Sequence, residues 1–192
     1  MGTRGCIARG VERTPGVMGF DGRYHHWDSY PTGLGETLYQ LFNGFFKKNA
    51  TQFLQVLIDD HPAGWSTING CDFSLPAGYD DGGSDYAKKK DGTTDYDHPI
   101  AHGGRCYCHG TRHEGENTVT EKDAQACGCE WAYASDEKKL LMSVMSSYGQ
   151  EGAKMIGMFG FGDDKASWKP VAIVDLTGAE PDWKVIEATG KE

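Results

Sequence analysis

Residues 22–35 have the sequence GRYHHWDSYPTGLG, and this stretch decides the fold that the sequence predicts. Its first half is rich in aromatic residues, which favours a β-strand over residues 23–30. Pro31 and Gly33 then end the strand, because proline and glycine interrupt regular structure. An apolar stripe with helical spacing begins at Leu34 and predicts a helix. We therefore expect a strand that turns directly into a helix.

The remaining segments add strands and helices without regular alternation. Short strands are expected over residues 3–9, 129–134, 138–148 and 168–176, and helices over residues 51–60 and 180–188. Residues 10–22 are rich in glycine and predict a loop between the first two strands. Strands in hairpin order and separate helices are typical of the α+β class. We therefore predict a single α+β domain over residues 1–192, with a mainly antiparallel sheet and a few short helices.

A polar, Gly- and Asp-rich insertion is expected over residues 76–104, PAGYDDGGSDYAKKKDGTTDYDHPIAHGG. The segment has few aliphatic side chains, so it cannot bury enough apolar surface to form a core of its own. Residues 105–130, which follow it, contain four of the six cysteines. They form a candidate metal-binding subregion.

Composition and charge exclude several classes of function. The chain of 192 residues is 38% hydrophobic, enough for a core, and its formal charge is −9. Nucleic acids and anionic membranes bind clustered Lys and Arg, so the charge argues against both partners and suits a basic host protein. The sequence has neither an apolar stretch of about 20 residues, as a membrane span requires, nor the apolar stretch of a signal peptide. We therefore expect a cytoplasmic protein whose cysteines are thiols or metal ligands.

The expected strand over residues 23–30 would gather polar groups on one face, because alternate side chains share a face. These residues are Tyr24, His26, Asp28 and Tyr30. Arg4, on the neighbouring strand, can supply a cation for an anionic ligand. The five residues form a candidate binding site for a small polar or anionic molecule, such as a nucleotide.

The same residues permit two other interpretations. Asp28 can orient the imidazole of His26 in a hydrolase that acts on a phosphate or acyl bond, although no nucleophile is identifiable. Alternatively, an Asp28–Arg4 pair among aromatic side chains would only join the strand to the helix. The spacing of the residues does not distinguish among these interpretations.

MGTRG at the N-terminus and YHHWDSYPTGLG before the helix resemble a family of uncharacterised proteins from bacteriophages, bacteria and some fungi. Members of that family begin with a Thr-Arg pair and carry a His-Trp-Asp-x-Tyr-Pro box. The matching residues are Thr3, Arg4, His26, Trp27, Asp28, Tyr30, Pro31, Gly33 and Gly35. The resemblance ends near residue 45. It implies a phage or bacterial accessory protein and implies no reaction.

Two C-x-C pairs lie in the second half of the chain, in CYCHGTRH (106–113) and CGC (127–129). Four thiolates match the tetrahedral coordination of zinc. The predicted structural zinc ligands are Cys106, Cys108, Cys127 and Cys129, with His109 and His113 as alternates. The same cysteines can instead be buried apolar thiols or a disulfide or redox pair. A zinc ion here would stabilise the polar insertion that precedes it.

Three functions follow from these patterns. The first is a ligand-binding accessory protein that uses the N-terminal box and is stabilised by zinc. The second is a hydrolase that uses His26 and Asp28. The third is a zinc-stabilised interaction module that binds a host protein through its acidic surface.

Overall fold

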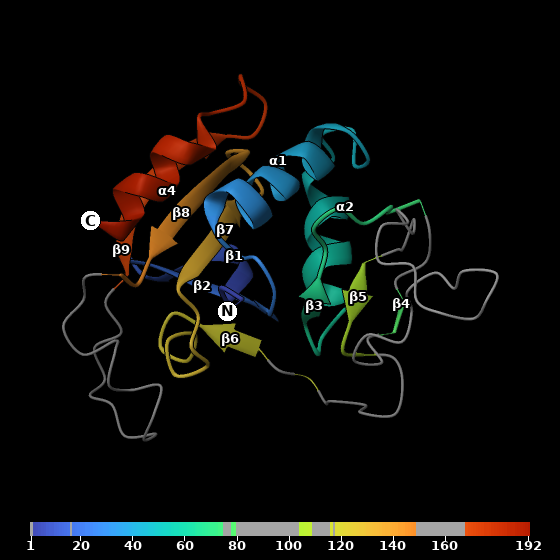
Figure 1. The fold of residues 1–192 in the computed structure, drawn as a ribbon, viewed down its shortest axis with the longest axis horizontal. Helices are drawn as coiled ribbons and strands as arrows, with labels where there is room; N and C mark the ends of the chain where they lie inside the picture. Colours follow the sequence, from blue (N-terminus) through green and yellow to red (C-terminus); the bar gives the residue numbers. More distant parts are fainter. Residues whose placement is uncertain are drawn as a thin grey trace, which may run out of the picture.

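A computed structural model describes residues 2–15, 17–74, 78–79, 104–108, 116, 118–148 and 168–192 (Figure 1). Its strands join in one sheet with the order β4-β5-β3-β2-β1-β7-β8-β9, and β6 pairs with β2. The strands are β1 (Gly5–Thr14), β2 (Val17–His25), β3 (Trp65–Thr67), β4 (Gly78–Tyr79), β5 (Arg105–Cys106), β6 (Thr118–Thr120), β7 (Trp131–Asp136), β8 (Leu141–Ser146) and β9 (Lys169–Asp175).

The described helical segments are short, as the α+β prediction required. They are the π-helical turn η1 (Pro31–Gly35), α1 (Glu36–Asn43), α2 (Ala50–Leu54), the π-helical turn η2 (Gln55–Asp59) and α4 (Trp183–Lys191). The α+β class is therefore confirmed. Among the described residues, no helix combines the length and the apolar character that crossing a membrane requires.

The sheet is mixed, so the prediction of a mainly antiparallel sheet is wrong. The pairs β1–β2 and β7–β8 are antiparallel, as their short connections require. However, β1 lies parallel to β7 near the centre of the sheet, and β2–β3 and β4–β5 are also parallel. Long connections that include the helices separate β1 from β7 and allow parallel pairing. The hairpin β1–β2 is also longer than expected, because residues predicted as a loop continue both strands.

The strand predicted over residues 23–30 ends at His25, so the later part of that prediction is wrong. The backbone amides of His26 and Trp27 donate to carbonyl oxygens of β3 at 3.1 Å. Asp28 then adopts a φ of 55°, which is a left-handed conformation that an extended strand cannot contain. The side chains after His25 consequently do not continue the alternation of a strand.

Each face of the sheet has its own core. Figure 1 shows α1 and α4 over one face, where Trp183 and Leu38 pack in the same buried cluster as Ile7 and Tyr133. Gly190 of α4 allows close packing, because a Cβ there would lie 2.1 Å from the Trp131 ring. We call this cluster the helix-side core.

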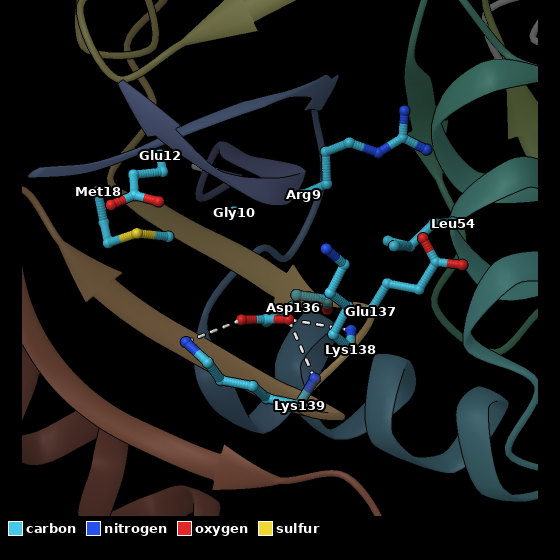
Figure 2. A pocket seen from close by; sticks show the side chains of 10 residues that line it. Arg9, Gly10, Glu12, Met18, Leu54, Asp136, Glu137, Lys138 and Lys139 are labelled. Carbon is cyan, nitrogen blue, oxygen red and sulfur yellow. Dashed lines mark hydrogen bonds and ion pairs between the residues drawn. The ribbon is translucent and has the colours of Figure 1, made fainter. Parts of the chain in front are cut away.

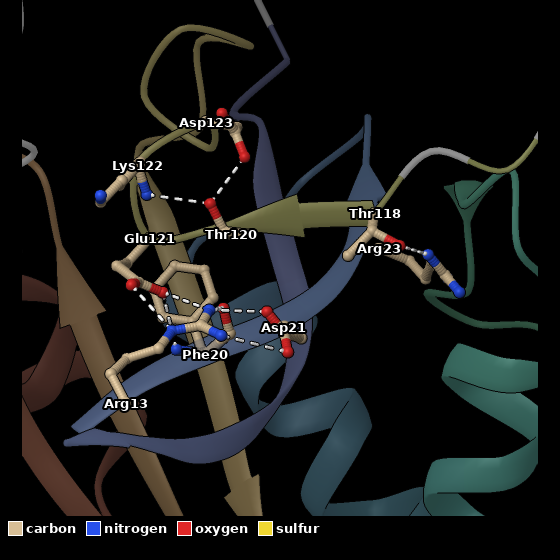
Figure 3. A network of polar contacts seen from close by, with 9 residues as sticks. All are labelled: Arg13, Phe20, Asp21, Arg23, Thr118, Thr120, Glu121, Lys122 and Asp123. Carbon is tan, nitrogen blue, oxygen red and sulfur yellow. Dashed lines mark hydrogen bonds and ion pairs between the residues drawn. The ribbon is translucent and has the colours of Figure 1, made fainter. Parts of the chain in front are cut away.

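The opposite face carries a smaller core. Its buried members are Cys6, Ala8, Phe20, Val119, Ala124, Cys129, Ala132 and Ala134. Figure 3 shows how polar contacts hold β6 and the following turn against the hairpin β1–β2. Arg13 pairs with Asp21 at 2.6 Å and with Glu121 at 2.8 Å. The buried Arg23 donates to Thr118 Oγ1 at 2.6 Å. We call the cluster of buried residues on this face the opposite core.

Candidate metal centre

The strongest chemical cluster among the described residues consists of His61, Cys106 and Cys108. One ligand atom from each residue lies within 4.8 Å of the other two. Tetrahedral zinc with Zn–S bonds of about 2.3 Å holds its donor atoms about 3.5–3.8 Å apart. Small side-chain adjustments therefore bring the three donors to bonding distance of one ion.

Two neighbouring loops bring these donors together. His61 begins a turn after η2, in which Gly64 N donates to His61 O at 3.0 Å. Gly64 has a φ of 84°, and a Cβ there would lie 2.7 Å from Tyr24 O. The Tyr107 amide donates to Gly64 O at 3.0 Å, which holds the Cys106–Cys108 segment against this turn. Backbone hydrogen bonds therefore hold the two loops that carry the donors together.

The three donor side chains are shielded from solvent to different degrees, and one sulfur receives a backbone hydrogen bond. The side chains of His61 and Cys106 are buried, and that of Cys108 is half-buried. The Ala63 amide donates to Cys108 Sγ at 3.3 Å. A backbone N–H directed at a sulfur stabilises negative charge on it. The imidazole of His61 packs on Trp65 with a centroid distance of 4.2 Å, which restrains the ring.

A cavity of about 170 Å³ adjoins this cluster and shares His61 with it. Its other lining residues are Phe45, Gln52, Val56, Trp65, Phe73 and Gly104. The walls are thus mainly aromatic, and Gln52 is the single uncharged polar side chain in the lining apart from His61. Sites for small molecules commonly combine apolar walls with a few polar groups.

The predicted four-cysteine site is not assembled among the described residues. Cys106 and Cys108 lie with His61, whereas Cys129 is buried in the opposite core with its Sγ 3.2 Å from Gly5 O. Burial raises the pKa of the Cys127 and Cys129 thiols above the ordinary value. The two C-x-C pairs lie in different parts of the fold. Cys106 belongs to β5, which pairs with β3. Cys129 directly precedes β7 and packs in the opposite core with residues of β1.

His61 was missed by sequence reasoning, because it lies far from the cysteines in the chain and shares no spacing motif with them. The alternates His109 and His113 lie outside the described residues. Cys6, which no sequence pattern joined to the C-G-C pair, is buried in the opposite core with Cys129. Burial also raises the pKa of the Cys6 thiol.

The predicted N-terminal box separates into two groups. Tyr24 Oη lies 2.8 Å from His26 Nδ1, and Tyr24 packs against the opposite core. The exposed Arg4 lies near them, and its Nη1 would be 2.9 Å from a Cβ at Gly128. These three residues form what we call the Arg4 group.

Asp28 and Tyr30 follow the end of the strand. Asp28 is exposed, and Tyr30 packs against the helix-side core. Burial, with the nearby carboxylates of Asp28 and Glu187, raises the pKa of Tyr30. The five residues therefore do not share one face, because the chain leaves the strand after His25. The hydrogen-bond partner of His26 Nδ1 is the Tyr24 hydroxyl, and not the carboxylate of Asp28 that the hydrolase interpretation assumed.

His25 forms a buried polar contact in this region. The prediction did not include it in the binding site, because its side chain alternates with those of Tyr24 and His26. His25 Nδ1 lies 2.7 Å from Ser29 Oγ, and His25 Nε2 accepts from the Ile68 amide at 3.2 Å. The acceptor role of Nε2 requires the proton on Nδ1. Burial lowers the pKa of His25 to about 3. His25 therefore joins the loop to β3 as a neutral side chain.

A second cleft, of about 340 Å³, lies at the end of β1 and β7 (Figure 2). Its charges of both signs are largely paired within the protein. Arg9 binds Asp59 through two hydrogen bonds of 2.8–2.9 Å, and Lys139 pairs with Asp136 at 3.3 Å. These pairs compensate part of the charge that lines the cleft, so its charges do not indicate a particular ligand.

Comparison of the chain with protein-family models, with curated protein sequences and with solved structures finds no match. The function is therefore inferred from the geometry of the site.

Proposed function

We propose that this protein binds one zinc ion through His61, Cys106 and Cys108. The observation that supports the proposal is the convergence of the three donor atoms within 4.8 Å. Two thiolates and an imidazole are the donors that zinc prefers among the common divalent metals. The Ala63 amide, 3.3 Å from Cys108 Sγ, supplies the supporting hydrogen bond that metal-bound thiolates commonly receive.

The zinc ion would stabilise one edge of the sheet. Strand β5 has two residues and β3 has three, so backbone pairing alone holds this edge weakly. An ion bound to both His61 and Cys106 would cross-link the turn after η2 to β5. Because such a site is absent from the unfolded chain, the free energy of metal binding adds to folding stability.

The test is elemental mass spectrometry of protein purified without an affinity chelate, combined with thermal melting. We expect about one zinc per chain in the wild type, and a lower melting temperature after chelation. Cys106→Ser and Cys108→Ser should lose the metal and the chelator effect. Cys127→Ser is the matched control, because this thiol lies outside the cluster, and it should retain zinc.

Two results would contradict the proposal. One is a metal-free wild type whose melting temperature does not respond to added zinc. The other is loss of zinc in Cys127→Ser with retention in Cys106→Ser, which would place the ion at the C-G-C pair.

A second candidate function is the binding of a small anionic molecule, such as a nucleotide, by the Arg4 group. The observation that favours it is the exposed Arg4 guanidinium beside Tyr24, whose hydroxyl lies 2.8 Å from His26. Arginine binds phosphate and carboxylate through paired hydrogen bonds. This function agrees with a phage or bacterial accessory protein. A basic host protein is a separate candidate partner, which the net charge of −9 suits.

A further inference from the structure

We propose that the cavity of about 170 Å³ beside His61 binds a neutral aromatic molecule of one ring that carries a polar substituent, such as an amide or a hydroxyl group. We call this space the aromatic cavity. The inference goes beyond the proposed zinc site and does not depend on it, because side chains and not a metal ion form the contacts that it invokes.

The inner wall of the aromatic cavity is held in place by contacts within the protein. Trp65 is fully buried, and its Nε1 donates to Leu57 O at 2.8 Å. The imidazole of His61 packs on the Trp65 ring at a centroid distance of 4.2 Å. These contacts restrain both rings before a ligand arrives. Binding to such a preformed wall costs less conformational entropy than binding to mobile side chains.

Aromatic rings continue from this wall towards the surface. The Phe73 ring lies 6.1 Å from that of Trp65 and 6.0 Å from that of Phe45, measured between centroids. Phe45 also packs edge-to-face on the buried Phe46 at 4.9 Å, which restrains it. The Phe45 side chain is 42% exposed, so a ligand that covers it removes apolar surface from water. Aromatic ligands add the preferred edge and face contacts of ring pairs.

The volume of the aromatic cavity limits the ligand to one ring. A Cβ at Gly104 would lie 2.6 Å from the Trp65 ring and 3.3 Å from the Phe73 ring, so only glycine lets the backbone approach both rings. A cavity of about 150 Å³ accommodates benzene. The aromatic cavity, at about 170 Å³, therefore has room for one ring and a small substituent.

The lining favours a neutral ligand with one polar end. Its described residues include no Asp, Glu, Lys or Arg, so a carboxylate or an ammonium group would lose hydration without meeting a fixed opposite charge. Gln52 lies one helical turn before Val56, and both line the cavity. The Gln52 side chain is exposed, and its amide can both donate and accept a hydrogen bond. The ring of the ligand would therefore lie inward beside Trp65, with its polar substituent outward at Gln52.

The experiment titrates the full chain with benzamide and follows the indole N–H signals by nuclear magnetic resonance. We expect a saturable shift of the Trp65 signal. Benzoate, which has the same ring and a charged substituent, should bind about tenfold or more weakly. Val56→Phe, which fills the cavity, should weaken benzamide binding about tenfold or more, and Gln52→Leu should weaken it by about two- to tenfold. Val185→Phe, on the exposed side of α4, is the matched control and should bind like the wild type.

Two further measurements keep the test decisive if a variant loses its fold or its metal. Zinc content and thermal melting are recorded for every protein, so that a lost metal is not mistaken for a lost ligand site. Magnetisation transfer between the benzamide ring and the Trp65 ring locates the ligand in the wild type without any substitution.

Four results would overturn the inference. The absence of saturable benzamide binding to the folded wild type would refute the site. Binding without magnetisation transfer to Trp65, or with equal affinity in a folded Val56→Phe protein, would place the ligand elsewhere. Equal affinities for benzoate and benzamide would refute the neutral class. A metal-free wild type that binds benzamide in the cavity would refute only the zinc site, whereas a zinc-loaded protein that does not bind it would refute only this inference.

Discussion

Replacing His25 with glutamine should reduce the loss of stability that acidification causes. His25 has a pKa of about 3 in the folded protein, against 6.5 for an exposed histidine. Above pH 6.5 both states are neutral, so the residue adds no pH dependence. Between pH 6.5 and pH 3 the unfolded chain takes up a proton that the folded protein excludes, and stability falls by about 1.4 kcal/mol per pH unit. The expected loss at pH 5 is on the order of 2 kcal/mol.

The assay is urea unfolding of wild type and His25→Gln at pH 7 and pH 5. Glutamine keeps an amide oxygen that can accept from the Ile68 N–H, so we expect a less stable protein whose pH dependence is smaller by about 2 kcal/mol. Both proteins retain His61 and the cysteines, so any proton-linked release of metal contributes equally. An equal change in stability for wild type and His25→Gln would refute the reasoning.

The remaining predictions concern helix packing and the Arg4 group. Gly190→Ala should lower the free energy of unfolding by about 1–3 kcal/mol, because its Cβ would overlap the Trp131 ring; Gly10→Ala, whose Cβ meets nothing nearer than 3.7 Å, is the control in the same urea titration. If the Arg4 group binds nucleotides, Arg4→Gln should weaken the binding of adenosine monophosphate about tenfold or more in calorimetry. Asp28→Asn should have no such effect, and equal losses in both variants would show that the original five-residue site is intact.

Local patterns predicted much of the fold. The apolar stripe that begins at Leu34 led to α1, and the apolar run in residues 138–148 led to β8. Cys106 and Cys108 were predicted together as metal ligands because both lie within one short segment, and the structure brings both into one cluster with His61. Each of these features depends on the order of residues within a few positions, which is what periodicity records.

Contacts between distant segments could not be predicted in this way. The parallel pairing of β1 with β7 depends on which strands meet after the helices pack, and no local pattern predicts it. His61 approaches Cys106 only because β3 and β5 are adjacent. The strand assumed for the five-residue box ends early for a different reason, since the left-handed conformation of Asp28 ends the alternation that the prediction assumed.

The position of the proposed metal has a consequence for the stability of one edge of the sheet. Few backbone pairs join β3 to β2 and to β5, so the cavity walls formed by Trp65 and Gly104 depend on contacts outside the ladder. A zinc ion bound to His61 and Cys106 would fix both sides of that wall. The proposed zinc ion would therefore stabilise this edge most, because the longer ladders that join β1 to β2 and to β7 hold the centre of the sheet without it.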